Sequence, residues 1–312
     1  MKSATAVGFR AGNALVSHTP PRLRYGAARL FGTVAYLAGR GTRRQALENY
    51  AGVVHQPTSS PLVRRTARES MVGYAKLLAD FMLLPSLRPE EIDAMVEWDG
   101  YQNIEQALAQ QRGVIVVTPH FGNWDIAAAA AARRGLPLTA VTEHFGNDGL
   151  NQEVVAARER IGMKVVPLSV SAGKAVLTAL RHREVVALVC DLPPREGRTL
   201  TVRVCGQDAV VPAGPATLAL KTGAPVVPIM CHRRADNRYL LEVQTPIDFE
   251  PSGDDQRDEV ALAQAIMDRF EPTLLAAPEQ WYLYSPIWNQ AAINHGGQSQ
   301  PGDATGSRAM AR

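Results

Sequence analysis

Residues 114–125 read Val-Ile-Val-Val-Thr-Pro-His-Phe-Gly-Asn-Trp-Asp and lead from a strand into a helix. The β-branched run at the start follows a turn signal and predicts a strand covered on both faces. Asn123 can cap the alanine-rich stretch that follows, which predicts a helix over residues 123–134. His120 therefore follows the carboxyl end of a strand, where α/β folds build their sites.

His120 and Asp125 form a His-x4-Asp pair within this stretch. Asp125 falls in the first helical turn, where the helix dipole favours its negative charge. Its carboxylate can turn back to one imidazole nitrogen of His120 and leave the other nitrogen free to take a proton. The pair predicts an acyl-transfer dyad; the alternative is a structural histidine, because the spacing also arises by chance.

Strand and helix patterns alternate from about residue 96 onward. The chain has 312 residues, 46% of them hydrophobic and 20% charged, which is ordinary for a globular α/β core. We expect a mostly parallel central sheet flanked by helices. The expected strands are 96–98, 114–118, 138–142, 164–167, 185–190, 200–204, 225–231 and 239–243, and the expected helices are 101–111, 123–134, 150–161, 171–181, 213–222 and 257–271.

The chain divides into three parts by composition. Residues 1–95 are predicted to be an N-terminal helical segment at a membrane surface, with helices over 21–39, 43–56 and 61–84. Residues 96–290 are predicted to form the α/β catalytic core. The tail, 291–312, is polar and rich in Gly, Ser and Pro, which predicts disorder.

The first 44 residues carry seven arginines and no acidic residue. A helical stripe of apolar side chains lies among them: Leu23, Ala27, Leu30, Phe31, Val34 and Leu37. Such a helix can lie on an anionic membrane or pack on the core. No apolar run is long enough for a membrane span and no signal-peptide core is present, so we expect a peripheral protein on the cytoplasmic face of the cell membrane.

Several classes of chemistry lack their motifs in this sequence. There is no G-x-S-x-G elbow, P-loop or G-x-G-x-x-G after a strand, which argues against a serine hydrolase, a kinase or a dinucleotide enzyme. No histidines are spaced for one metal ion. The three cysteines lack CxxC spacing and are predicted to be buried thiols rather than disulfides or zinc ligands.

Three further charged residues can reach the expected site, two of them just after strands and one on a helix. Glu143 follows strand 138–142, and Arg158 lies on the next helix, where it can hold a phosphate or be an exposed helix charge. Asp191 follows strand 185–190 and can be a site acid or a loop cap. Asn123 and the amides near Gly122 can stabilise an oxyanion or cap the helix.

An ordered set of motifs carries a resemblance to a known family. They are Pro119-His120-Phe121-Gly122-Asn123-Trp124-Asp125, Thr142-Glu143, Arg158, Ile161-Gly162, Val166-Pro167-Leu168, Pro212-Ala213-Gly214-Pro215-Ala216, Thr222-Gly223-Ala224-Pro225-Val226-Val227-Pro228, Pro278-Glu279-Gln280-Trp281 and Trp288. Over about residues 20–289 the sequence resembles the bacterial lysophospholipid-type acyltransferases of the lipid A biosynthesis and phosphatidylinositol mannoside acyltransferase family.

The resemblance implies transfer of a fatty acyl chain from a thioester, acyl-CoA or acyl carrier protein, to a hydroxyl of a membrane glycolipid, without a covalent acyl-enzyme. It implies that His120 is the base and that Asp125 orients it. Glu143, Arg158 and Asp191 would then line the acceptor side. Members that acylate phosphatidylinositol mannosides carry Glu-Arg-Asp-Leu or Asp-Arg-Asp-Leu after the strand, whereas here only Asp191 matches, before Leu192-Pro193-Pro194.

We therefore expect acyl-CoA to donate a chain to a phosphatidylinositol mannoside whose phosphate is held by Arg158, with no cofactor, metal or nucleic-acid partner. The spacing of the site residues favours this branch. The alternatives are a lipid A-type acyltransferase, a metal-assisted hydrolase that uses the same His and Asp, and a non-catalytic glycolipid-binding protein.

Overall fold

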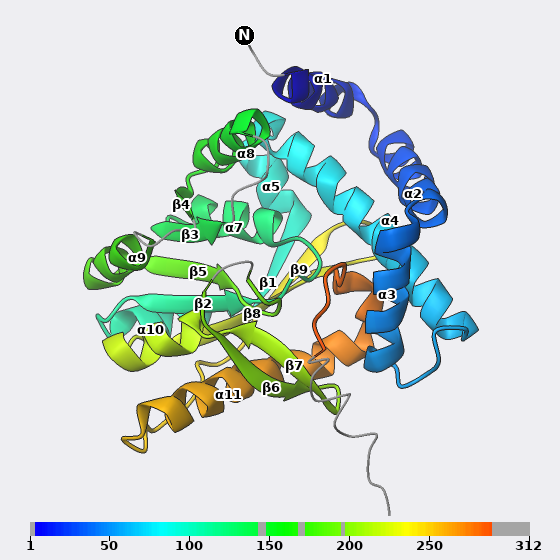
Figure 1. Ribbon diagram of the computed structural model, residues 1–312. Helices are drawn as coiled ribbons and strands as arrows, with labels where there is room; N and C mark the ends of the chain where they lie inside the picture. The colour runs from blue at the N-terminus through cyan, green and yellow to red at the C-terminus, as the bar shows by residue number, and fades with distance from the viewer. Residues whose placement is uncertain (1–3, 143–147, 168–171, 195–196, 289–312) are drawn as a thin grey trace, which may run out of the picture.

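The computed structural model describes residues 4–142, 148–167, 172–194 and 197–288. A seven-stranded sheet in the order β1-β9-β8-β2-β5-β3-β4 lies between layers of helices (Figure 1). Its strands are β1 (Val96–Asp99), β2 (Val114–Thr118), β3 (Leu138–Thr142), β4 (Lys164–Pro167), β5 (Val185–Val189), β8 (Val226–Arg233) and β9 (Tyr239–Val243). The five strands β8, β2, β5, β3 and β4 are parallel, and β9 pairs antiparallel to β8. The mostly parallel α/β sheet expected from the sequence is confirmed.

The helices that precede and interrupt the sheet follow the expected alternation. They are α1 (Ala4–His18), α2 (Pro21–Ala38), α3 (Arg40–Val53), α4 (Pro61–Leu83), α5 (Pro89–Met95), α6 (Gln102–Ala109), α7 (Trp124–Arg133), α8 (Asp148–Arg160), α9 (Ala172–Arg181), α10 (Gly214–Thr222) and α11 (Asp255–Ala276), with short 3-10 turns η1 (Leu84–Ser86) and η2 (Pro278–Gln280). No separate helix was predicted at α5, a short element that leads directly into β1.

Strand β2 is buried along its whole length between two helical layers. Ile115 and Val117 pack in the cluster that includes α9, α10 and α11, whereas Val114 and Val116 pack in the cluster that includes α6. Successive side chains of a strand point to opposite faces, so a run of β-branched residues satisfies both layers. This burial fixes the position of the carboxyl end of β2, a central strand of the sheet.

A two-stranded hairpin, β6 (Thr199–Val204) and β7 (Gln207–Pro212), lies outside the main sheet. Only its first strand was expected from the sequence. The turn residues Cys205 and Gly206 have φ of 49° and 69°, which is the backbone that a two-residue hairpin turn requires. Cysteine before glycine is not a usual turn signal, and for this reason the second strand escaped sequence analysis.

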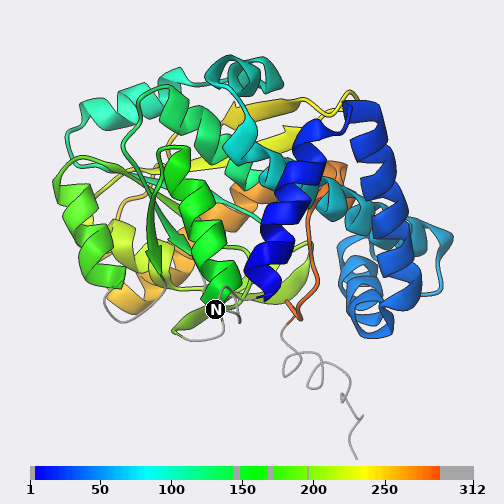
Figure 2. The same ribbon diagram turned by 90° about the horizontal axis from the view of Figure 1, so that it is seen from above.

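Helix α2 packs on α4 at the outside of the molecule, away from the sheet (Figures 1 and 2). Small residues of α2 are buried, and its large apolar side chains are exposed. Ala28 and Gly32 are buried, and a Cβ on Gly32 would lie 2.6 Å from the carbonyl oxygen of Met71. The exposed large apolar side chains of α1 and α2 are Leu15, Leu23, Leu30, Phe31, Val34 and Leu37. The stripe therefore does not pack on the core, contrary to one of its two interpretations.

Within the described ranges, no helix is both long enough and apolar enough to cross a membrane. Cys190, Cys205 and Cys231 are buried free thiols, as expected. Burial raises the pKa of the Cys231 thiol to about 12, so this side chain behaves as a small apolar group.

Candidate active site

His120 and Asp191 meet at the carboxyl ends of two adjacent parallel strands. His120 lies two residues after β2 and Asp191 two residues after β5, whose last residues, Thr118 and Val189, are paired in the sheet. The imidazole Nδ1 and the Asp191 Oδ1 are 2.7 Å apart. The Asp191 side chain has no exposed surface, whereas that of His120 is 33% exposed. The pair therefore joins a buried carboxylate to an imidazole that reaches solvent.

A C-terminal segment closes over the loop that carries His120. The amide of Gly122 donates to the carbonyl of Gln280 at 2.9 Å, and the amide of Tyr282 donates to the carbonyl of His120 at 2.8 Å. Between them, the indole Nε1 of Trp281 donates to Oδ2 of Asp191 at 2.7 Å. Both oxygens of Asp191 are thus engaged, one by an imidazole and one by an indole.

Asp125 does not pair with His120 as the sequence predicted. Its two carboxylate oxygens accept from Arg158, 2.7 Å from Nε and 3.2 Å from Nη2. The side chains of Asp125 and Arg158 are only 4% and 9% exposed. Two charges that are buried together must satisfy one another, so this carboxylate is held between α7 and α8.

The same pair changes the interpretation of Arg158. Its guanidinium faces Asp125 and lies 5.6 Å from the centre of the Phe81 ring, inside the protein. It is neither an exposed helix charge nor a cation free to hold a phosphate. Glu143, the other charged residue expected on the acceptor side, lies outside the described residues.

Asn123 caps α7, which is the structural one of its two expected roles. Its Oδ1 accepts from the amide of Ile126 at 3.1 Å, and its Nδ2 donates to the hydroxyl of Tyr239 at 3.1 Å. Gly122 has φ of +60°, and a Cβ there would lie 1.5 Å from the carbonyl oxygen of Cys231. The Gly122 amide is bonded to Gln280 and the Asn123 side chain is fully buried, so neither of these two groups is free to stabilise an oxyanion.

A chain of aromatic side chains begins at one side of the imidazole. The ring of Trp124 meets that of His120 edge-on, with centres 5.1 Å apart and planes at 80°. Tyr282 packs against Trp124 and against Tyr74, with ring centres at 6.2 and 5.3 Å. Edge-to-face contacts of this kind stabilise a particular ring orientation. Trp124 and Asp191 together restrain His120 on two sides.

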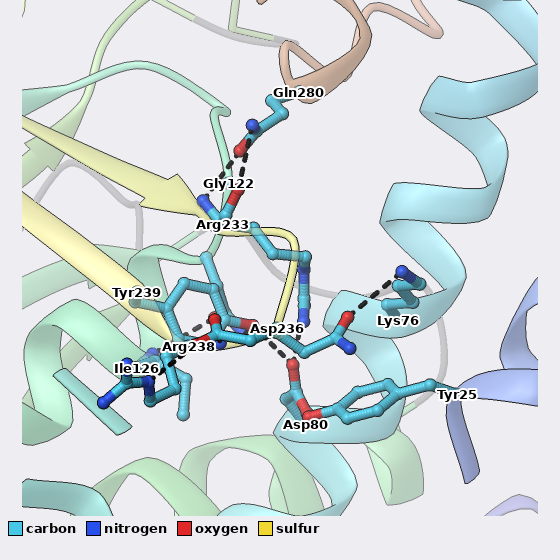
Figure 3. Close-up of polar contacts among 12 residues, drawn as sticks. Tyr25, Lys76, Asp80, Gly122, Ile126, Arg233, Asp236, Arg238, Tyr239 and Gln280 are labelled. Carbon is cyan, nitrogen blue, oxygen red and sulfur yellow. Dashed lines mark hydrogen bonds and ion pairs between the residues drawn. The ribbon is translucent and has the colours of Figure 1, made fainter. Parts of the chain in front are cut away.

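A buried polar network centred on Asp80 supports the loop that carries His120 (Figure 3). Asp80 accepts hydrogen bonds from Tyr25 at 2.8 Å, from Arg233 at 2.6 Å and from Tyr239. Burial, followed by the charge of Asp80, raises the pKa of the Tyr239 hydroxyl, so it remains a neutral donor. The sequence does not indicate this network, because its members come from three distant segments, at residues 25, 80 and 233–239.

The same network reaches the C-terminal segment. The backbone of Arg233 and the side-chain amide of Gln280 bond in both directions, at 2.8 and 3.1 Å, beside Gly122 (Figure 3). Gln280 is thereby held where Trp281, the next residue, can reach Asp191. The arrangement links a buried ion pair to the position of the His120 loop.

The chemistry available to the site is proton transfer by an imidazole. A carboxylate can only accept, so the contact with Asp191 keeps a hydrogen on Nδ1 and leaves a lone pair on Nε2. In the part of the chain that the structure describes, no protein group is hydrogen-bonded to Nε2. No group of three or more His, Cys, Asp or Glu side chains that could hold a metal ion occurs there either.

Comparison with known proteins identifies relatives over nearly the whole chain. The family model described as bacterial lipid A biosynthesis acyltransferase matches residues 7–290. A phosphatidylinositol mannoside acyltransferase of Mycolicibacterium smegmatis is 29% identical over 287 residues, 91% of each chain. One of Mycobacterium tuberculosis is 28% identical over 297 residues, 92% of this chain and 89% of the relative. A lipid A biosynthesis myristoyltransferase of Escherichia coli is 29% identical over 148 residues, 47% of this chain and 45% of the relative.

Proposed function

This chain belongs to the bacterial lipid A biosynthesis acyltransferase family, and we propose that it moves a fatty acyl chain from acyl-CoA to a hydroxyl of a phosphatidylinositol mannoside. The observation that carries the mechanism is the contact between His120 and the buried Asp191. A thioester is already activated, so the enzyme must chiefly deprotonate an alcohol and place it. An imidazole with a hydrogen on Nδ1 and a lone pair on Nε2 is suited to that task.

In the proposed reaction, Nε2 of His120 removes the proton of the acceptor hydroxyl as its oxygen attacks the thioester carbonyl. The carbon–sulfur bond breaks, and the imidazolium returns the proton to the leaving thiolate. Asp191 stabilises the positive charge on the ring during this step, as the carboxylate does in other His–Asp pairs. Proton transfer by a placed group of this kind contributes about 10²–10⁴ in rate.

Coverage by relatives supports a mannosylated phosphoinositide as the acceptor. The relatives named for phosphatidylinositol mannoside align with about nine-tenths of this chain, whereas the lipid A myristoyltransferase aligns with less than half. The phosphate of such an acceptor must be met by a group other than Arg158, because that guanidinium is buried on Asp125. Arg158 therefore does not hold the acceptor phosphate in the proposed site.

The outward stripe of α2 supports attachment to the cytoplasmic surface of the membrane, where the acceptor lipid resides. Leu30 and Phe31 are 67% and 62% exposed, and Arg22, Arg29 and Arg40 are exposed on the same segment. Apolar side chains can enter the lipid boundary while arginines meet anionic head groups.

The catalytic proposal is tested by an acyl-transfer assay with purified protein, palmitoyl-CoA and phosphatidylinositol mannoside in detergent micelles. We expect an acylated lipid product from the wild-type protein and none above background from His120→Ala, with both proteins folded by circular dichroism. Hydrolysis of the thioester without any acylated lipid would contradict the transferase proposal. Loss of activity on addition of EDTA would instead favour a metal-assisted reaction.

The membrane proposal is tested by flotation with vesicles that contain anionic phospholipid. Leu30→Ser/Phe31→Ser should reduce the bound fraction at least tenfold, because each inserted side chain contributes roughly 1.5–3 kcal/mol. Leu275→Ser removes an exposed leucine on α11, far from α2 in the chain, and serves as the matched control. Equal binding of the double variant, the control and the wild type would refute α2 as the anchor.

A further inference from the structure

Asp191 is a carboxylate buried inside the protein. Its side chain is 0% exposed, and among the described residues no lysine or arginine forms an ion pair with it. Burying a carboxylate is costly unless hydrogen-bond donors replace the lost water. The donors that the structure provides are Nδ1–H of His120 and Nε1–H of Trp281, both at 2.7 Å.

Trp281 is itself held firmly in place. It is 1% exposed, and its carbonyl accepts from the hydroxyl of Tyr50, which also contacts Ser70. Its backbone forms an isolated bridge with Phe121, the residue after His120. The indole therefore cannot swing away from Asp191 without disrupting the segment that covers the His120 loop.

We infer that Trp281 is a positioning residue of this site: its indole N–H fixes one oxygen of Asp191 so that the other faces Nδ1 of His120. The inference rests on the proposed acyl transfer, in which that contact orients the base. An indole is suited to the role because it donates one hydrogen bond, cannot accept one and carries no charge. The indole keeps its own proton, so of the two donors to Asp191 only the imidazole can gain or lose a proton during the reaction.

The chain offers a matched control for this role. Trp288 lies on the same C-terminal segment, and its buried Nε1 has no hydrogen-bond partner in the part of the chain that the structure describes. Trp281→Phe and Trp288→Phe therefore make the same chemical change. Only the first removes a hydrogen bond to a carboxylate.

The first measurement is steady-state kinetics of the two variants at a temperature where both are folded. A hydrogen bond to a charged group, when lost, lowers kcat for Trp281→Phe by about ten- to a hundredfold. The KM values for donor and acceptor should stay within about twofold, because Trp281 contacts neither substrate in this mechanism. Trp288→Phe should keep kcat within about twofold. Equal kcat for the two variants, or a loss in Trp281→Phe confined to KM, would overturn the assignment.

The second measurement needs no activity and separates this inference from the proposed function. In ¹H–¹⁵N spectra, the indole resonance of Trp281 is identified as the one that disappears in Trp281→Phe. Asp191→Asn should move this resonance and leave that of Trp288 unchanged. Trp281→Phe should also displace the His120 Nδ1–H resonance, whereas Trp288→Phe should not. If the wild-type protein acylates no lipid but these shifts occur, the function is wrong and the positioning stands. If the His120 resonance is the same in both variants, the positioning is wrong.

Discussion

Removing the charge of Asp125 should lower the stability of the protein, whereas removing the charge of Asp191 should lower its turnover. Asp125→Asn leaves the Arg158 guanidinium, 9% exposed, without its counter-charge. Removing one partner of a buried ion pair costs about 3–5 kcal/mol of unfolding free energy, because the remaining charge stays desolvated. The asparagine oxygen can still accept one hydrogen bond, which places the loss near the lower value. At roughly 2–4 °C for each kcal/mol, we expect Tm to fall by about 6–12 °C.

Asp191→Asn should instead reduce turnover. The indole of Trp281 can still donate to the amide oxygen, so the amide nitrogen faces Nδ1 of His120. The imidazole must then carry its hydrogen on Nε2, where it cannot take the proton of the acceptor. We expect kcat to fall by about 10²–10⁴ while Tm changes little.

Thermal unfolding by circular dichroism and steady-state acyl transfer, measured on both variants well below their Tm, distinguish the two effects. The control is the double variant Asp125→Asn/Arg158→Gln. It also removes the buried positive charge of Arg158 and should recover part of the lost Tm. If Asp125→Asn kept its Tm and lost as much kcat as Asp191→Asn, Asp125 would orient His120 after all. The assignment of Asp191 as the partner of His120 would then be refuted.

Three further outcomes follow from the contacts. Gly122→Ala should give little folded protein on expression, because its Cβ would lie 1.5 Å from the carbonyl oxygen of Cys231; Gly135→Ala, with open space around it but the same positive φ, is the control. Arg233→Met should lower the unfolding free energy by about 3–5 kcal/mol in urea titration, since the buried Asp80 would lose its cationic partner, and Asp80→Asn added to it should recover part of the loss. Arg198 forms an ion pair with Glu259, with Nη2 and Oε2 2.5 Å apart. Hydrogen bonding from Arg198 lowers the pKa of Glu259, so its contribution to stability is present above pH 4.5 and is lost as pH falls below that value. Wild-type Tm should therefore drop more between pH 5 and pH 3 than that of Glu259→Gln, and equal drops would contradict this ion pair.

Local sequence was sufficient for the elements that carry the site. The β-branched run of β2, the cap at Asn123 and the helix after it are all decided by neighbours within a few residues. The sequence also placed His120 and Asp191 at the carboxyl ends of their strands, as the structure has them. The second hairpin strand, β7, was missed because Cys205 occupies a positive-φ turn position that usually signals itself with asparagine or aspartate.

The partner of His120 was decided by tertiary structure. Periodicity tells which face of a strand is apolar but not which strand lies beside it. Once β5 pairs with β2 in the register Thr118 to Val189, residues two positions beyond each strand end meet, and His120 contacts an aspartate 71 positions away. Asp125 is nearer in sequence, yet α8 brings Arg158 to it and removes it from the imidazole.

The stripe on α2 and the contact of Trp281 also depended on tertiary structure. The apolar stripe and arginines of residues 21–39 were evident in the sequence, but only the packing of α2 on α4 decided that the stripe points outward. Nothing near Trp281 in the sequence indicates a carboxylate 90 positions away. Short-range patterns determined the elements and their surfaces, because those depend on local backbone preference and burial. Strand order and helix packing decided which charges meet, because a buried charge takes whichever partner the fold brings within reach.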